Sequence, residues 1–184
     1  SSKLENKVSP LLTIAMPSDA DTAGDAFAAA ERALRDVEAR MSAKLADSEL
    51  ARLNAGPVDK ELELSAEMME LLAGSRGLAE ATNGAFDVTC RPILLAWQRA
   101  GREGRLPTDD EISLALAASG WHNLELLAGG VRKLSSEASI DLGGIAKGHG
   151  IDRAVAVLKD MGVSAGLVDV GGDEGVEADP HVDV

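Results

Sequence analysis

The chain has 184 residues, of which 45% are hydrophobic, and this is enough for one compact domain with its own core but too few for two. Its formal net charge of −13 argues against binding to nucleic acid or to an anionic membrane surface, because both would be repelled. No apolar run approaches the ~20 residues that a membrane span requires, and the N-terminal residues carry no signal-peptide pattern, so we expect no membrane insertion by this chain. The single cysteine, Cys90, allows no internal disulfide and no thiolate metal cluster, and we expect a small buried side chain there.

The first half of the chain predicts a short strand followed by helices. Apolar residues from Leu11 to Met16 favour a strand that ends at Pro17. Apolar side chains then recur at three- and four-residue steps and predict an amphipathic helix to about Arg40. Residues 47–54 have the pattern of a single capped helical turn, and Ser65 begins a further helix that ends at Asn83-Gly84.

The second half mixes helices with a hairpin. An extended piece is expected over Ala85 to Thr89, and Pro92 is placed as the first residue of a short helix through Trp97. Thr108 and Glu111 have the spacing of a capping box, which predicts a helix that reaches Ser119. Because helices and hairpin strands are mixed, the sequence predicts the α+β class in a single domain over residues 1–184. The expected strands of this half are residues 124–127 and 131–134, which form the hairpin, and residues 167–170.

The stretch from Ser139 to Asp152 has the pattern of a strand, a glycine turn and a helix N-terminus. Ile140 to Leu142 would be the strand, and Lys147 lies one turn into a helix that runs to Asp160. Backbone N–H groups at such a corner, joined by an ammonium, suit a phosphate or pyrophosphate. The spacing excludes a P-loop and the dinucleotide pattern G-x-G-x-x-G. The alternative is a packing turn with a solvated lysine.

Four groups of residues carry a family resemblance through their order and spacing. They are Met41-Ser42 with Asp47 to Leu50 and Asn54; Gly84 to Thr89 with Pro92 and Trp97; Asp141 to Gly148 with Asp152; and Gly171-Gly172-Asp173. Together they resemble the FAD:protein FMN transferase (ApbE) family over almost the whole chain. The resemblance implies an ApbE-like fold, with a mixed sheet and flanking helices, and a chain that corresponds to roughly the N-terminal two-thirds of a family member and lacks the C-terminal third.

What the resemblance implies for function is a protein flavinyltransferase. Such enzymes bind FAD and Mg²⁺, move FMN to a Thr hydroxyl of a target protein and release AMP. The family is periplasmic or anchored at the inner membrane, although this chain carries neither a signal nor a lipid-anchor cysteine. The residues expected to bind FAD are Ala85, Phe86, Asp87, Asp141 and Lys147, and the metal is expected to face the carbonyl of Gly144. No catalytic residue is implied.

The sequence also departs from the family pattern. Lys44 stands where the family commonly has an aromatic residue, and no Thr follows Thr108 to form the family's late Asp-x-x-x-Thr metal element. We therefore expect weak Mg²⁺ binding and feeble transfer by residues 1–184 alone. The alternatives are a degenerate FAD-binding or flavin-carrier module without transfer activity, and an inert scaffold. Asp87 and Asp141 have two further interpretations: they bond to ribityl or ribose hydroxyls, or they cap neighbouring turns.

Overall fold

The computed structural model describes residues 3–9, 12–17, 20–163 and 166–170. The chain divides into two compact units, one formed by residues 1–35 with 147–184 and the other by residues 36–146. One boundary falls within helix α1 (Ala20–Met41) and the other at the start of helix α6 (Ala146–Asp160). No described helix combines the length and the apolar character that crossing a membrane requires. The prediction of a single domain over residues 1–184 stays a prediction.

The first unit contains an antiparallel sheet of three strands in the order β1-β2-β6. Strand β1 (Lys3–Ser9) pairs with β2 (Leu12–Pro17), and β2 pairs with β6 (Leu167–Asp169), with Ile14 opposite Val168. The sequence predicted β2 and β6 but not β1. Strand β1 is mostly polar, with neither a clear apolar alternation nor a turn of the hairpin type, so its pairing was not readable locally.

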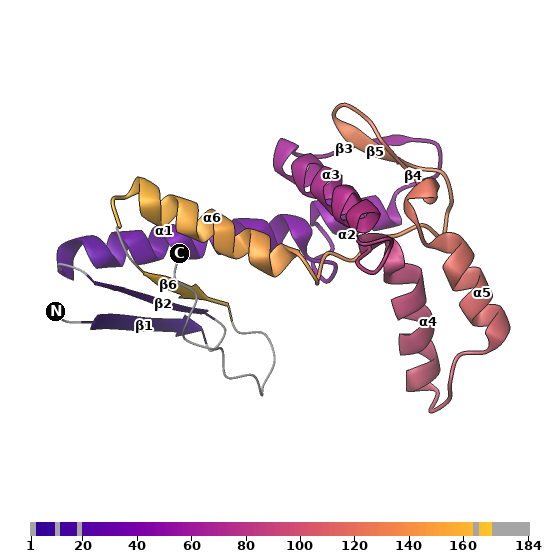
Figure 1. Cartoon of the computed structure of the whole chain (residues 1–184), viewed down its shortest axis with the longest axis horizontal. Helices are drawn as coiled ribbons and strands as arrows, with labels where there is room; N and C mark the ends of the chain where they lie inside the picture. Colours follow the sequence, from indigo (N-terminus) through magenta and orange to yellow (C-terminus); the bar gives the residue numbers. More distant parts are fainter. Residues whose placement is uncertain (1–2, 10–11, 18–19, 164–165, 171–184) are drawn as a thin grey trace. The chain divides into compact units, whose positions relative to one another are not determined.

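Helices α1 and α6 provide the core of this unit (Figure 1). The amphipathic helix predicted from apolar residues at three- and four-residue steps is confirmed. Phe27 and Ala30 of α1 are buried together with Ala154 and Leu158 of α6. Val168 of β6 completes the cluster. Helix α6 ends before Gly162, whose positive φ of 82° is the left-handed conformation expected after a helix.

The second unit contains the remaining helices and a second antiparallel sheet, with strands in the order β3-β5-β4. Val131 of β5 lies opposite Leu62 of β3 on one side and Leu126 of β4 on the other. Both sheets pair antiparallel within the described strands, where a mixed sheet was expected, and one isolated bridge between Val58 and Lys133 is parallel. The elements are α2 (Glu49–Ala55), β3 (Glu61–Glu63), α3 (Ala66–Ala81), η1 (Val88–Cys90), α4 (Arg91–Arg102), α5 (Asp109–Ala118), η2 (Trp121–Asn123), β4 (Leu124–Leu126) and β5 (Gly130–Lys133).

The predicted helix starts are confirmed by their caps. The hydroxyl oxygens of Ser48 and Ser65 accept hydrogen bonds from backbone N–H groups three residues on, at 2.9 and 3.2 Å. The capping box of Thr108 and Glu111 is complete, since each side chain accepts from the backbone N–H of the other residue. These bonds satisfy N–H groups that have no partner within the helix.

Two predictions for residues 85–102 are wrong. Residues 85–89 are not a continuous extended piece, because Asp87 caps the short helix η1. Helix α4 does not end at Trp97 but continues to Arg102, where a loop was expected from Gly101. The physical reason is tertiary: α4 packs against α5 (Figure 1), and Ala100 is fully buried. Burial of one face offsets the cost of a glycine in the last turn.

Candidate functional site

The candidate site is built around an extended segment, residues 138–142, that passes between α2 and η1. The amide of Asn54 holds Ile140 from one side: Asn54 Nδ2 donates to the Ile140 carbonyl at 2.9 Å, and the Ile140 N–H donates to Asn54 Oδ1 at 2.7 Å. On the other side the Asp141 N–H donates to the Val88 carbonyl at 2.8 Å. The prediction of a strand at Ile140 to Leu142 is wrong, because a side chain and a helical turn take the place of a strand partner.

The glycine turn after this segment is shaped by Asp141 and Phe86. Asp141 Oδ1 accepts a hydrogen bond from the Gly143 N–H at 2.8 Å, and a Cβ at Gly143 would lie only 2.9 Å from that oxygen. A Cβ at Gly144 would lie 3.2 Å from Cε2 of Phe86, so the ring rests against the Gly144 backbone. A Cβ at either position would crowd the Asp141 carboxylate or the Phe86 ring, so close approach favours glycine at both positions.

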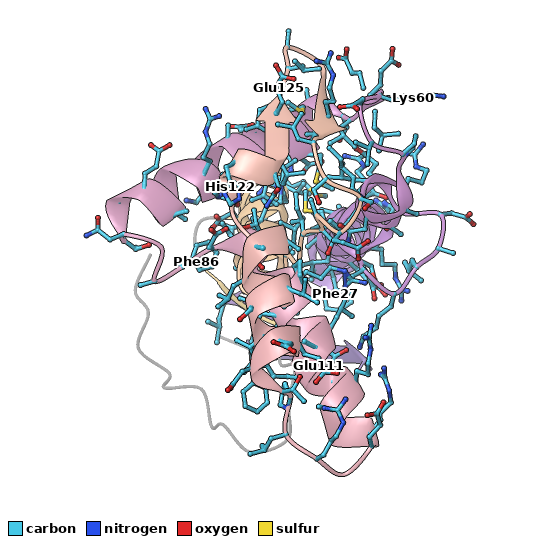
Figure 2. All side chains as sticks on the ribbon, turned by 90° about the vertical axis from the view of Figure 1, so that its right-hand side faces the viewer. Phe27, Lys60, Phe86, Glu111, His122 and Glu125 are labelled. Atoms are coloured by element: carbon cyan, nitrogen blue, oxygen red, sulfur yellow. The ribbon has the colours of Figure 1, made fainter. Side chains whose placement is uncertain are left out.

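The end of α3 places Phe86. Asn83 and Gly84 both have positive φ, and the Gly84 N–H donates to the Ala79 carbonyl at 2.8 Å, which confirms the predicted stop. The Phe86 N–H then donates to Thr82 Oγ1 at 3.1 Å. Phe86, labelled in Figure 2, is half-buried against the core of this unit. Its ring packs against the core cluster, and its Cε2 atom lies next to Gly144.

Asp87 has a capping role. Its Oδ1 accepts from the Thr89 N–H at 2.8 Å and from the Thr89 hydroxyl at 2.7 Å. The buried Thr89 hydroxyl oxygen in turn accepts from the Gly120 N–H at 2.7 Å. Asp87 and Asp141 thus each cap a neighbouring turn through Oδ1, which is one of the two interpretations that the sequence left open. The Oδ2 atoms take part in no hydrogen bond with the residues that the structure describes.

The two carboxylates come close to one thiol. Burial raises the pKa of Cys90, and the negative charges of Asp141 and Asp87 raise it further. Cys90 follows Thr89 and is partly exposed, where the sequence favoured a buried residue. Its environment shows that Asp87 and Asp141, far apart in the sequence, contribute to one local field. The thiol is held protonated there and is a poor nucleophile at neutral pH.

The predicted FAD-binding residues fall in both units. Ala85, Phe86, Asp87 and Asp141 belong to the second unit, together with the expected metal contact Gly144. Lys147 is exposed in the first turn of α6, which belongs to the first unit, so its position relative to the others stays a prediction. The motif Gly171-Gly172-Asp173 and the acidic tail with His181 lie outside the described residues.

The described part of the chain offers little to a metal by itself. Within residues 3–9, 12–17, 20–163 and 166–170, no group of three or more His, Cys, Asp or Glu side chains is arranged to hold an ion. Mg²⁺ is usually bound by one or two carboxylates plus substrate phosphates and water. Asp141, whose Oδ2 accepts no hydrogen bond from the described residues, fits this partial kind of site, and the expected contact through the Gly144 carbonyl stays a prediction.

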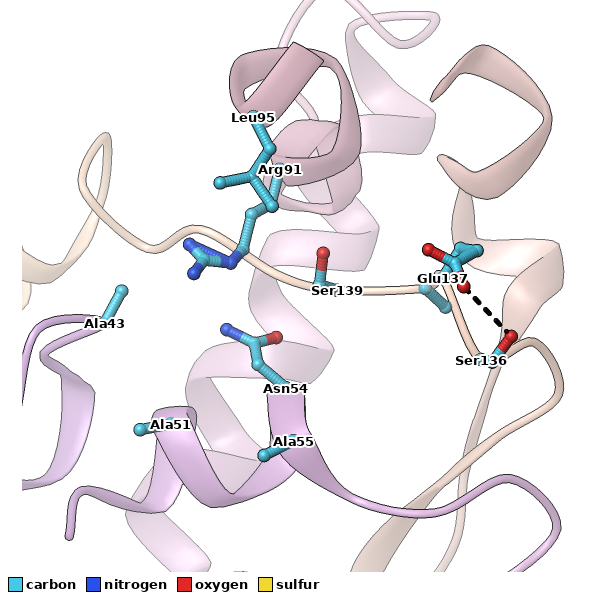
Figure 3. A pocket seen from close by; sticks show the side chains of 10 residues that line it. Ala43, Ala51, Asn54, Ala55, Arg91, Leu95, Ser136, Glu137 and Ser139 are labelled. Atoms are coloured by element: carbon cyan, nitrogen blue, oxygen red, sulfur yellow. Dashed lines mark hydrogen bonds between the residues drawn. The ribbon is translucent and has the colours of Figure 1, made fainter. Parts of the chain in front are cut away.

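Sequence reasoning missed a cleft of about 370 Å³ that is lined in part by residues 138 and 139 of the same segment (Figure 3). It is lined by Arg91 and Leu95 of α4, by Asn54 of α2 and by residues 136–139. Asn54 was noted only as part of a motif, and Arg91 has no local signal beyond its place before Pro92.

Lys133 joins two residues that line this cleft. Its buried Nζ donates to the carbonyls of Asn54 at 3.0 Å and Ser136 at 3.1 Å. Burial lowers the pKa of Lys133, and the carboxylate of Glu137 raises it in part. The ammonium therefore ties the end of α2 to the loop that forms the opposite wall. Nothing in the sequence pattern marked Lys133, because both partners are backbone carbonyls.

A model of the ApbE family matches residues 9–180 of the chain. A Vibrio cholerae protein named FAD:protein FMN transferase is 32% identical over 146 residues, which cover 78% of this chain and 43% of that protein. A Haemophilus influenzae protein of the same name is 32% identical over 150 residues, with the same shares covered. The chain thus spans less than half the length of these curated relatives.

Solved structures agree in fold. The flavin transferase ApbE from Vibrio cholerae superposes with a TM-score of 0.81 at 26% identity, over 93% of this chain and 57% of that chain. The ApbE protein from Thermotoga maritima gives a TM-score of 0.74 at 26% identity, over 87% and 53% of the two chains. The predicted α+β class and ApbE-like fold are confirmed. From the family match and these likenesses, the chain belongs to the ApbE family.

Proposed function

We propose that this chain is part of a protein flavinyltransferase that binds FAD and moves FMN to a Thr hydroxyl of a target protein. The observation that carries the proposal is the corner where Phe86 rests against Gly144 beside the carboxylates of Asp87 and Asp141. It offers an aromatic face, a backbone that a ligand can approach closely and two oxygens free for hydroxyl groups. The names of the Vibrio and Haemophilus relatives, FAD:protein FMN transferase, support the same reaction.

The roles of the residues follow from their chemistry. Asp87 Oδ2 and Asp141 Oδ2 accept hydrogen bonds from ribityl or ribose hydroxyls, while their Oδ1 atoms keep the turns in place. Ala85 and Phe86 contact FAD through backbone and ring, respectively. The Lys147 ammonium binds the pyrophosphate, which this acidic chain otherwise repels.

The transfer itself is a displacement at phosphorus. The Thr oxygen of the acceptor forms a bond to the FMN-side phosphorus of FAD, and the bond from that phosphorus to the bridging oxygen breaks. AMP leaves with the electron pair, and the hydroxyl proton passes to water. The Gly144 carbonyl would help to hold Mg²⁺, which would offset the charge that builds on the phosphates. The chain's own contribution is to orient the dinucleotide and to leave the phosphorus open to an acceptor.

Binding is tested by titrating the chain with FAD and with riboflavin while flavin fluorescence is followed. We expect tighter binding of FAD, because riboflavin has no phosphate for the corner between Ser139 and Asp152. Equal affinities, or no binding of either flavin, would contradict the proposal.

A second candidate is an FAD carrier without transfer activity. The observation that favours it is that the described residues form no cluster of three or more His, Cys, Asp or Glu side chains able to hold a metal ion. Incubation with FAD, Mg²⁺ and a Thr-containing acceptor separates the two candidates. An FMN adduct in the mass spectrum together with free AMP identifies the transferase, whereas tight FAD binding without either product identifies the carrier.

A further inference from the structure

Thr89 is a buried polar residue beside the carboxylate of Asp87. Only 2% of it is exposed, and it lies in the short helix η1 that Asp87 caps. The cap requires only the bond from the Thr89 N–H to Asp87 Oδ1, at 2.8 Å. The Thr89 hydroxyl adds a second donor to the same oxygen, at 2.7 Å. Capping alone therefore does not explain the hydroxyl.

The Gly120 N–H fixes the direction of the hydroxyl proton. It donates to Thr89 Oγ1 at 2.7 Å, so the hydroxyl accepts from Gly120 and has its single proton to donate to Asp87. The distance of 2.7 Å from Oγ1 to Asp87 Oδ1 agrees with the ~2.5–2.7 Å that is usual when a hydroxyl donates to a carboxylate. Both partners of the Thr89 hydroxyl are thus determined by the fold.

The backbone at Gly120 has a conformation that favours glycine. Gly120 lies 31 residues after Thr89, between α5 and η2, and its φ of 100° falls in the left-handed region. A Cβ at this position would lie 2.7 Å from Nδ1 of His122, which Figure 2 labels. A residue with a side chain would have to displace the His122 ring or the backbone. The N–H that reaches Thr89 therefore depends on glycine here.

The two bonds to Oδ1 leave the other oxygen of Asp87 for a ligand. A carboxylate oxygen has two lone pairs, and Oδ1 uses both of them for the N–H and the hydroxyl of Thr89. The Oδ2 atom takes part in no hydrogen bond with the residues that the structure describes. Because the β-branched Thr89 side chain is restricted at χ1, its hydroxyl keeps the Asp87 carboxylate in one orientation. The direction of Oδ2 is thus set before a ligand binds, and this lowers the cost of ordering.

We propose that Thr89 is a positioning residue for flavin binding: its hydroxyl, oriented by the Gly120 N–H, holds the Asp87 carboxylate so that Oδ2 faces a hydroxyl group of FAD. The part of Asp87 as an FAD ligand rests on the proposed function. The hold of Thr89 and Gly120 on the carboxylate does not, since it follows from the hydrogen bonds of the chain itself. Thr89 acts through Asp87 and does not touch the flavin.

The test compares the FAD affinities of variants of the whole chain by flavin fluorescence. Thr89→Val keeps the shape of the side chain but removes the hydroxyl, and it should weaken FAD binding about tenfold, the effect of one lost hydrogen bond to a charged group. Thr89→Ser keeps the hydroxyl and should bind FAD nearly as tightly as the parent chain. Ser119→Ala is the matched control, because it removes a part-buried hydroxyl next to Gly120 that donates to the Ala115 carbonyl and not to Asp87. No loss in Thr89→Val, or an equal loss in Thr89→Ser or Ser119→Ala, would overturn the proposal.

A double-mutant cycle shows whether the hydroxyl acts through Asp87. Asp87→Asn keeps an oxygen for Thr89 but removes the negative charge, so this variant should already bind FAD weakly. Adding Thr89→Val to Asp87→Asn should then cost little further affinity. The same tenfold loss in both backgrounds would show a general effect of Thr89 on the fold, against the proposal.

Measurements without FAD separate this proposal from the proposed function. In Thr89→Val the Gly120 N–H loses its acceptor, so its hydrogen exchange should accelerate, and the ¹³C resonance of the Asp87 carboxyl should shift. Thr89→Ser should preserve both. An Asp87 resonance that is the same in Thr89→Val and in the parent chain would contradict the positioning role, whether or not FAD binds. If the parent chain binds no FAD, the proposed function fails, and the Asp87 and Gly120 resonances still decide whether Thr89 holds the carboxylate.

Discussion

The clamp between Asn54 and Ile140 makes a quantitative prediction. Asn54→Ala removes both side-chain hydrogen bonds and leaves the N–H and the carbonyl of the fully buried Ile140 without partners. Each such group costs about 1–3 kcal/mol, so the sum is about 2–6 kcal/mol. Because Asn54 is itself half-exposed and water can reach the gap, we expect the lower part, about 2–4 kcal/mol. This is a large share of the ~5–15 kcal/mol by which domains are stable.

The assay is urea unfolding followed by circular dichroism, together with hydrogen exchange at the Ile140 amide. Asn54→Asp is a partial control, because it keeps an acceptor for the Ile140 N–H, while the oxygen that replaces Nδ2 repels the Ile140 carbonyl. Exchange at Ile140 should become fast in Asn54→Ala and stay slow in Asn54→Asp. A loss below about 0.5 kcal/mol in Asn54→Ala, with Ile140 still protected, would refute the reasoning, because the clamp would then carry no net stability.

Three further predictions concern the corner, the cation and pH. Gly144→Ala should weaken FAD binding severalfold, because the new Cβ would lie 3.2 Å from the Phe86 ring, whereas Gly148→Ala meets nothing within 4 Å and should leave FAD binding unchanged in the same titration. Lys147→Met keeps the aliphatic stem and should lower FAD affinity by about 1.5–3 kcal/mol; unchanged affinity would return Lys147 to a solvated charge. Arg105 binds Glu111, labelled in Figure 2, through two hydrogen bonds of 2.7 Å and lowers the pKa of that carboxyl from 4.5 to about 2. Because the folded pKa lies below the ordinary value, the stabilisation is complete above about pH 4.5 and is lost as the pH falls toward 2. The difference in melting temperature between the parent chain and Arg105→Gln should shrink over that window, and a difference that is independent of pH would contradict this pairing.

Part of the candidate site was accessible to sequence reasoning because its signals are local or belong to a family. The strand-turn-helix pattern located the glycine corner, and the motif resemblance named Phe86, Asp87 and Asp141. Arg91 escaped both routes. An arginine before a proline indicates only an ordinary helix start. The position of Arg91 in the wall of a cleft depends on how α4 packs, which the local sequence does not show.

The sequence by itself determined where most helices begin and end. Their ends depend on hydrogen bonds between groups only a few residues apart, which a short stretch of sequence can reveal. Examples are the caps at Ser48, Ser65 and Thr108 and the left-handed stop at Asn83-Gly84. Tertiary structure alone decided how Ile140 is held and what lies on either side of it. Asn54 and Ile140 are separated by 86 residues, and a side-chain amide takes the place of the strand that the apolar pattern predicted. Periodicity records which face of a segment is buried, but it does not record which distant donor satisfies the backbone there.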